Sequence, residues 1–400
     1  MFNKLLIKIA MAKNMHKKSF SEETKLKLDI FRECFREWFP VFVHQTFWNK
    51  LYIYDFFAGS GYDVDGTPGS PIVLLEEAMG EKSKHCNNIK NSEKNVTFVF
   101  NEHEPTKEQN KFKELKINIE NHIKKCEKDN NCGHCCFSVH FANMDFGKEF
   151  KTNTNIRGIL NNTNNGKFVI LDQYGFAQVD AEVFMTLVNA PRTDFIFFIS
   201  SSFLRRFKEH PVSKKFIGDG NLSFDEESKP KECHQIIVKY FESMIPSNKE
   251  YYLNHFTIKK GANYYGLIFG TAHTLGMEKF QRVCWNIDSR AGESNCNTQN
   301  DFETNTLFGC LETKKIQNVK EQLTKEILSG EITDNIKGLK RALSLRCLPS
   351  VFTEIVKDLE KKKKIERSGS KSYKSTDIHK IKENQENYYK INKCNENNKN

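Results

Sequence analysis

The sequence has no apolar run longer than about ten residues, whereas a helix that crosses a bilayer needs roughly 18 to 20. We therefore expect no membrane-spanning segment and no membrane partner. Only 12 of the 400 residues are cysteine, far below the density of a disulfide-stapled secreted scaffold. Residues 1–20 begin with a basic, briefly apolar stretch that has no small-residue cleavage site. These absences predict a cytoplasmic protein with reduced thiols and a flexible leader over residues 1–20, with an amphipathic organellar presequence as the alternative.

Charge is distributed unevenly along the chain. The net charge is +10, and the last forty residues hold twelve Lys or Arg against five Asp or Glu. The rest of the chain is therefore close to neutral. Because the rest of the chain is near neutral, we do not expect it to bind polyanions over its whole surface. Any contact with phosphate is expected at the basic C-terminal end.

The period of the apolar residues changes along the chain. Residues 21–49 carry aromatic and aliphatic side chains at spacings near three and four, which predicts an amphipathic helix. Short runs rich in Val, Ile and Phe, with helical patterns between them, then predict buried strands. The predicted strands are 51–56, 96–101, 137–142, 167–172, 194–201, 251–258 and 263–270. This alternation indicates an α/β, Rossmann-like, mostly parallel sheet, and the four-residue connection KKGA indicates an antiparallel hairpin at its C-terminal end.

A second unit is predicted after a polar stretch that follows Trp285. Three short helical patterns between about residues 315 and 360 precede a basic turn, KKKKIERSGSK, an arrangement like a winged helix. From Ser368 onward the chain has too little apolar surface to offset the entropy of ordering. The predicted domains are therefore an α/β domain over 21–300, a winged-helix-like module over 301–367 and a disordered basic tail over 368–400.

One glycine-rich turn follows the first predicted strand, and acidic residues follow the later ones. Asp55 ends the first strand and leads into Ala58-Gly59-Ser60-Gly61, where backbone can approach a ligand closely. An ordinary turn is the alternative for a single G-x-G. Acids after the second, third and fourth strands fall at the same edge of the sheet: Glu102, Asp145 and Asp172. An acid after the second strand suits ribose hydroxyls and Asp145 suits an adenine amino group, so the pattern favours a nucleoside-type cofactor.

These residues resemble the motif series of class I S-adenosylmethionine-dependent methyltransferases. Three longer phrases, 54–78, 169–179 and 264–288, are similar to the three-Cys-motif partner (TcmP) family, over roughly residues 20 to 365. The resemblance implies S-adenosylmethionine as cofactor. The cofactor-binding residues that it implies are Asp55, Ala58, Gly59, Ser60, Gly61, Glu102 and Asp145.

The segment Asp172-Gln173-Tyr174-Gly175 stands where that family has Asp-Pro-Tyr-Gly. A base amino nitrogen needs an acceptor for its N–H and a stacked ring for alignment, so we expect Asp172 and Tyr174 to be catalytic. Gln173 departs from the pattern, because proline there rigidifies the strand end. The expected function is methylation of a nucleobase amino group of DNA or RNA. The alternative is a non-catalytic scaffold for a three-Cys-motif partner protein in a mobile-element or phage-related system.

Several other groups have two interpretations. Cys126, Cys132, Cys135 and Cys136 form the densest thiol cluster, but one C-x-x-C without a second favours free thiols over zinc, so no metal is predicted. Ser200-Ser201-Ser202 could bind phosphate or cap a helix. The loop 62–69 could cover a cofactor or lie on the surface without a role.

Overall fold

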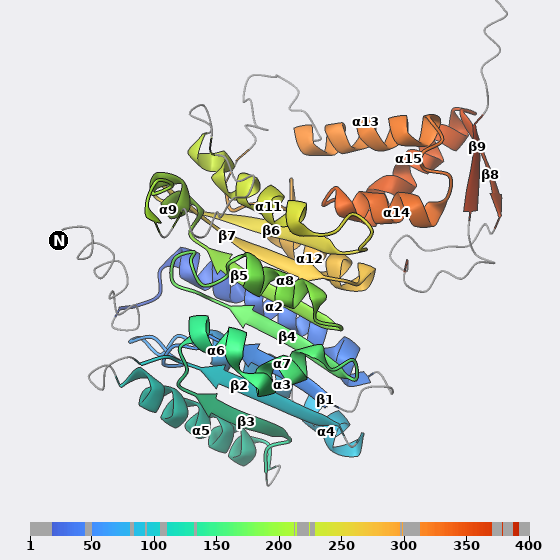
Figure 1. Cartoon of the computed structure of the whole chain (residues 1–400). Coiled ribbons are helices and arrows are strands. Elements are labelled where there is room, and N and C mark those ends of the chain that lie inside the picture. The colour runs from blue at the N-terminus through green and yellow to red at the C-terminus, as the bar shows by residue number, and fades with distance from the viewer. Residues whose placement is uncertain are drawn as a thin grey trace, which may run out of the picture. The chain divides into compact units, whose positions relative to one another are not determined.

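The structure is a computed structural model that describes residues 18–44, 50–80, 84–92, 94–104, 110–131, 134–211, 213, 224, 229–296, 298, 313–369, 378 and 387–391 (Figure 1). The predicted leader lies outside these residues except for 18–20. The chain divides into two compact units. The first comprises Met1–Tyr251 and Thr257–Ala272, and the second comprises Tyr252–Phe256 and His273–Asn400.

The central element is a seven-stranded sheet in the order β3-β2-β1-β4-β5-β7-β6. Its strands are β1 (Lys50–Asp55), β2 (Asn95–Asn101), β3 (Phe137–Ala142), β4 (Asn165–Leu171), β5 (Thr193–Ile199), β6 (Tyr252–Lys260) and β7 (Asn263–Thr271). The first five pair in parallel, and β7 runs antiparallel to β5. The predicted α/β class with a mostly parallel sheet is confirmed.

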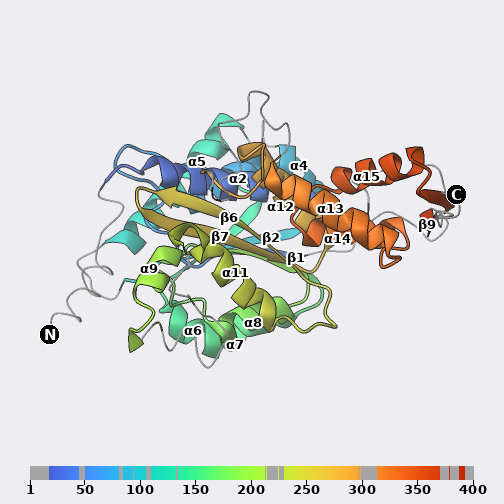
Figure 2. The ribbon, with the colours of Figure 1, turned by 90° about the horizontal axis from the view of Figure 1, so that it is seen from above.

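Helices cover both faces of the sheet in the first unit. One face carries α2 (Glu22–His44), α3 (Ser70–Met79), α4 (Lys84–Asn91) and α5 (Lys111–Asp129); the other carries α6 (Phe146–Thr152), α7 (Thr154–Asn161), α8 (Ala181–Asn189), α9 (Ser201–Arg206) and α11 (Cys233–Met244) (Figure 2). Strands buried on both faces explain why the runs are continuously apolar instead of alternating.

The amphipathic helix predicted near the N-terminus is α2. Its Phe35 ring lies 5.5 Å from Phe168 of β4 and 6.3 Å from Phe98 of β2, measured between centroids. The Trp38 indole of the same face donates a hydrogen bond of 2.9 Å to the buried Asp194 carboxylate. The aromatic stripe of α2 therefore packs on the centre of the sheet. Because each aromatic side chain buries a large apolar area, these contacts contribute much of the stability of the core.

The second unit contains α12 (Thr274–Ile287), α13 (Lys314–Leu328), α14 (Asn335–Ser344), α15 (Pro349–Lys361) and the antiparallel pair β8 (Ile365–Gly369) and β9 (Asn387–Ile391). Its core is formed by apolar residues of these helices, with Leu323, Leu339 and Phe352 fully buried. The Tyr389 amide donates to the Thr333 carbonyl at 3.0 Å, so β9 also meets the segment between α13 and α14. Three helices are thus present where the sequence predicted them, and the antiparallel strands that follow were not predicted.

Two predicted boundaries differ from what the structure shows. The tail was predicted to be disordered, but Asn387–Ile391 forms a strand. Its backbone pairs with β8, and the composition of the tail does not predict this pairing. Residues 370–377, 379–386 and 392–400 of that tail lie outside the described residues. The polar stretch after Trp285, predicted to precede the second unit, is ordered at its start, since the Asp288 carboxylate accepts the amides of Glu293 and Ser294. Over the part of the chain that the structure describes, no helix is long and apolar enough to cross a membrane.

Candidate functional site

The carboxyl ends of the central strands meet at one edge. Asp55 of β1 is in register with Phe100 of β2 and with Ile170 of β4. Because these strands are parallel, the residues that follow them emerge side by side, and ligands of open α/β sheets bind at this edge. The predicted acids after β2 and β4 therefore lie next to the glycine turn.

The glycine turn is a sharp bend held by two hydrogen bonds. Gly59 and Gly61 have φ angles of +66° and +94°, which a residue with a side chain rarely adopts. The Ala58 amide donates to the Asn101 carbonyl at 2.9 Å, and the Asn118 side chain donates to the Ser60 carbonyl at 2.7 Å. The bend is therefore a fixed feature of the sheet edge.

Glu102 points at this bend. Its Oε2 accepts the Gly59 N–H at 2.9 Å, and Lys111 of α5 lies 3.7 Å from Oε1. Burial raises the pKa of Glu102, although the Lys111 charge and the Gly59 amide act in the opposite direction. The acid predicted to bind a ribose thus faces the backbone that would approach the same ligand.

Asp55 is completely buried behind the bend. Ser70 Oγ at the start of α3 donates to its carboxylate at 2.6 Å, and the Phe57 amide donates at 3.1 Å. Burial, together with the charges of Asp172 and Glu102, raises its pKa to about 7 against these two donors. Asp55, Glu102 and Asp172 therefore share one electrostatic environment.

Asp172 is paired with a lysine that the sequence analysis missed. Lys27 Nζ of α2 donates to both carboxylate oxygens, at 2.7 and 2.6 Å, and lies 4.8 Å from the centre of the Phe198 ring. The two side chains are only 8% and 16% exposed. One signal was available, since Lys27 precedes Phe31 by one helical turn and so lies on the apolar face of α2.

The loop after β4 is rigid without proline. The buried Gln173 side chain donates to the Phe198 carbonyl at 3.0 Å and accepts the amides of Gln178 and Val179. Tyr174, by contrast, is 50% exposed. Gln173 therefore holds the loop internally, which replaces the stiffness of the proline that the resemblance implies, and leaves the Tyr174 ring accessible to a ligand.

Asp145 lies farther out along the same edge. It precedes α6 after β3, the edge strand of the sheet, and its half-exposed carboxylate is 4.0 Å from Lys148. The structure therefore brings Asp55, Glu102 and Asp172 together and leaves Asp145 two strands away from the glycine bend.

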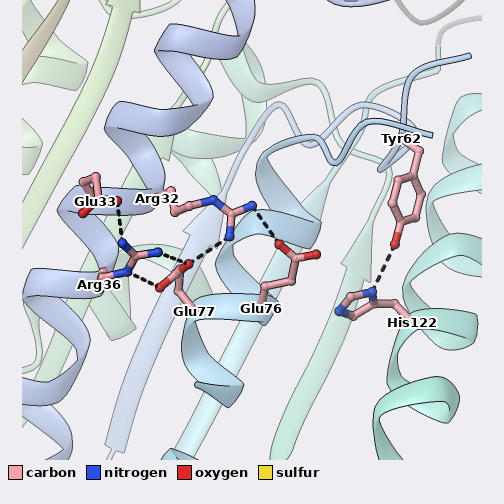
Figure 3. A network of polar contacts seen from close by, with 7 residues as sticks. All are labelled: Arg32, Glu33, Arg36, Tyr62, Glu76, Glu77 and His122. Carbon is pink, nitrogen blue, oxygen red and sulfur yellow. Dashed lines mark hydrogen bonds and ion pairs between the residues drawn. The ribbon is translucent and has the colours of Figure 1, made fainter. Parts of the chain in front are cut away.

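The loop between Gly61 and Ser70 is anchored on both sides. Asp63 accepts the amides of Phe20 and Thr67, both at 2.7 Å, and the Tyr62 hydroxyl lies 3.0 Å from His122 Nδ1 of α5 (Figure 3). Below the loop, arginines of α2 bind carboxylates of α3, the pairs being Arg32 with Glu76 and Glu77, and Arg36 with Glu77 (Figure 3). The inserted loop is thus an ordered wall beside the glycine bend.

Two of the three serines that follow β5 have partners inside the fold. The Ser201 hydroxyl is 2.9 Å from His234 Nδ1, and Ser202 Oγ accepts the Tyr264 amide at 2.6 Å, so both serines are internal. Cys132 lies outside the described residues. Among the residues that are described, no group of three or more His, Cys, Asp or Glu side chains is arranged to hold a metal ion.

No protein-family model and no curated protein matches the chain. Among solved structures, it is similar to the O-methyltransferase TomG from Streptomyces achromogenes, involved in tomaymycin synthesis and crystallised with S-adenosylmethionine. That match has 9% identity and a TM-score of 0.28 and covers 63% of this chain and 90% of the other. A protein from Klebsiella pneumoniae that is assigned as an O-methyltransferase matches with 8% identity, a TM-score of 0.28, and coverage of 67% and 94%.

Proposed function

We propose that this protein is an S-adenosylmethionine-dependent methyltransferase. The observation that carries the proposal is the contact of Glu102 with the Gly59 amide, which joins the ends of β1 and β2 over the buried Asp55. A glycine bend after the first strand and an acid after the second form the usual cradle for a nucleoside in such sheets.

The chemistry of the donor set fits this cofactor. Three carboxylates, Asp55, Glu102 and Asp172, lie in one environment, in which burial and their mutual charges raise the pKa of Asp55. A ligand with a positive charge and several hydroxyl and amino donors would reduce the repulsion among these carboxylates and satisfy their oxygens. S-adenosylmethionine has both the charge and the donors. When bound, it supplies an electrophilic methyl group. Glu102 would accept from its ribose hydroxyls and Asp145 from its adenine amino group.

The acceptor that we propose is an amino group of a nucleobase in DNA or RNA. Asp172 is held by Lys27 through one hydrogen bond on each oxygen, and each oxygen retains a second lone pair. Asp172 would use it to hold the N–H of the acceptor, while the exposed Tyr174 ring stacks on the base. Lys27 keeps the carboxylate oriented, so its role is positioning.

The second unit carries exposed positive charges that could bind the phosphates of a nucleic acid. Lys361 to Lys364 are all exposed; Lys361 ends α15, and the other three connect that helix to β8. Lysines at such a turn neutralise phosphates without reading sequence. We propose that this winged-helix-like module holds a nucleic-acid substrate in the cytoplasm.

Calorimetry with S-adenosylhomocysteine tests the proposal. We expect measurable binding by the full chain and a loss of roughly tenfold or more in affinity for Glu102→Gln, since a charged hydrogen bond contributes about 1.5 to 3 kcal/mol. Glu114→Gln, on the exposed face of α5, is the matched control and should bind as the native chain does. An absence of heat at millimolar ligand would refute the proposal and leave the scaffold for a three-Cys-motif protein as the function.

The substrate class needs its own experiment. Methylation of DNA and RNA oligonucleotides with labelled S-adenosylmethionine should yield a label on base amino groups. The label should be lost with Asp172→Asn, which replaces one acceptor oxygen by a donor. Label on oxygen or on protein would contradict the nucleobase assignment while sustaining methyl transfer.

A further inference from the structure

Aromatic side chains gather beside the loop that follows β4. Tyr174 of this loop is 50% exposed, and the rings of Phe198 on β5 and Tyr265 on β7 are partly exposed. These two rings are stacked, with 5.6 Å between their centroids and 18° between their planes. The Ser200 amide, just after β5, donates to the Gly175 carbonyl at 2.8 Å. The stacked pair therefore lies where the Tyr174 loop joins the end of β5.

Helix α9 adds a cation and another ring to this surface. Arg206 is exposed, and its guanidinium donates to the side chain of Asn263 at the start of β7. Asn263 and Tyr265 are two residues apart in one strand, so their side chains point to the same face. Arg206 therefore reaches the face of β7 that carries Tyr265. Phe207, the next residue, is 40% exposed.

A second cation stands at the turn between β6 and β7. β6 ends at Lys260 and β7 begins at Asn263, so this lysine and the Arg206 contact flank one tight turn. The exposed Lys260 Nζ lies 3.4 Å from Glu23 Oε2 and 2.5 Å from Ser21 Oγ. Glu23 neutralises part of the lysine charge, whereas Arg206 contacts an uncharged amide and keeps its charge.

We call these six residues the aromatic–basic patch: Tyr174, Phe198, Arg206, Phe207, Lys260 and Tyr265. All of them belong to the first unit. The patch begins at the proposed catalytic loop and continues over β5, α9 and the start of β7. It is thus separate from the lysines of the second unit, and it differs from them in carrying aromatic rings beside its cations.

We propose that this patch binds the unpaired nucleotides that flank the target base, so that the acceptor is single-stranded DNA or RNA. The inference rests on the nucleobase acceptor proposed above. A base inside a duplex is paired and stacked, so its amino group is out of reach of Asp172. Single strands expose the faces of their bases, and grooves that bind them combine aromatic rings with cations. Tyr265, supported by Phe198, would stack on a neighbouring base, and Arg206 would hold its phosphate.

Fluorescence anisotropy of the full chain tests the stacking step. The probes are fluorescein-labelled DNA and RNA of mixed sequence, each as a single strand and as a duplex, without cofactor. Tyr265→Leu should weaken binding of the single strands roughly tenfold. It should leave duplex binding within about twofold, because a duplex contacts the protein mainly through phosphates. Tyr265→Phe keeps the ring and should bind as the native chain does.

The dependence on salt tests the cation. Arg206→Gln should reduce the slope of log affinity against log salt by about 0.7 for a single strand, since one phosphate contact is lost. Tyr265→Leu should leave that slope unchanged. The matched controls lie on α5: Ile117→Ala for an exposed apolar side chain and Lys124→Gln for an exposed cation. Both should bind single strands as the native chain does.

Photocrosslinking of the native chain needs no variant to fold. Single strands that carry 5-iodouracil are irradiated in complex with the protein, and the linked peptides are mapped by mass spectrometry. We expect links to Tyr174, Phe207 or Tyr265, because the reagent couples to rings that stack on it. Links confined to the second unit, or single-strand binding by Tyr265→Leu at the native affinity, would overturn the proposal.

The outcomes separate this inference from the proposed function. If the patch variants lose single-strand binding but no nucleic acid is methylated, the patch stands and the methyltransferase assignment fails. If nucleobases are methylated while Tyr265→Leu binds single strands normally, the methyltransferase stands and the patch fails. If the chain binds no oligonucleotide at physiological salt, both the nucleic-acid acceptor and the patch are refuted, whereas calorimetry still decides cofactor binding.

Discussion

Replacement of Asp55 by asparagine should stabilise the fold at high pH and weaken binding of the cofactor. Asp55 is fully buried, and burial raises its pKa from 3.8 to about 7. An acid whose pKa is higher in the folded state is penalised once it ionises, so this part of the stability is present below pH 3.8 and is lost as the pH rises towards 7. Asparagine has the same shape and carries no charge.

The magnitude follows from the shift. A shift of about three pKa units means that ionised Asp55 destabilises the folded state by about 4 kcal/mol at pH 8. At pH 4 this penalty is less than about 1 kcal/mol. Asparagine retains both contacts, because its oxygen accepts the Phe57 amide and its NH₂ donates to the Ser70 hydroxyl, which can rotate. We therefore expect Asp55→Asn to raise the free energy of unfolding by about 2 to 4 kcal/mol at pH 8 and by little at pH 4.

Urea titrations of both proteins at the two pH values measure this difference. The comparison between variant and native chain isolates Asp55, since all other groups titrate in both. An equal change in stability at pH 4 and pH 8 would show that the buried charge carries no penalty and would refute the reasoning. Calorimetry on the same variant should show at least tenfold weaker S-adenosylhomocysteine binding, if the carboxylate is retained for the cofactor.

Three further substitutions have definite expected outcomes. Lys27→Met removes the ion partner of Asp172, whose side chain is only 16% exposed, and should lower the free energy of unfolding measured in urea by about 3 kcal/mol. Lys27→Arg keeps the charge and should lose less, so equal losses in the two variants would contradict a charge effect. Gln173→Ala removes three loop contacts and should reduce methyl transfer with cofactor affinity kept within about threefold, so an unchanged rate would count against loop rigidity. Gly266→Ala places a Cβ 1.9 Å from the His234 ring and should lower the melting temperature by several degrees, as about 1 to 3 kcal/mol of overpacking requires.

Local patterns along the chain were sufficient to predict the framework of the site. Continuous apolar runs identified the strands, and parallel strands present their carboxyl ends at one edge, so Glu102 and Asp172 had to emerge near the Gly59–Gly61 bend. The same reasoning placed Asp145 on this edge, but it could not show that the edge strand β3 keeps it away from the others. Strand order is a long-range property that periodicity does not contain.

The sequence by itself determined the α/β class, the glycine bend and the row of acids, because each depends on residues within one strand and its following turn. Only the tertiary structure decided that Lys27, 145 residues before Asp172, is its ion partner. It also decided that Gln173 stiffens its loop through Phe198. Such pairs form because packing of helices on the sheet buries polar groups, which must then find hydrogen-bond partners among the residues nearest in space. The spacing of residues along the chain does not predict which distant residues become neighbours.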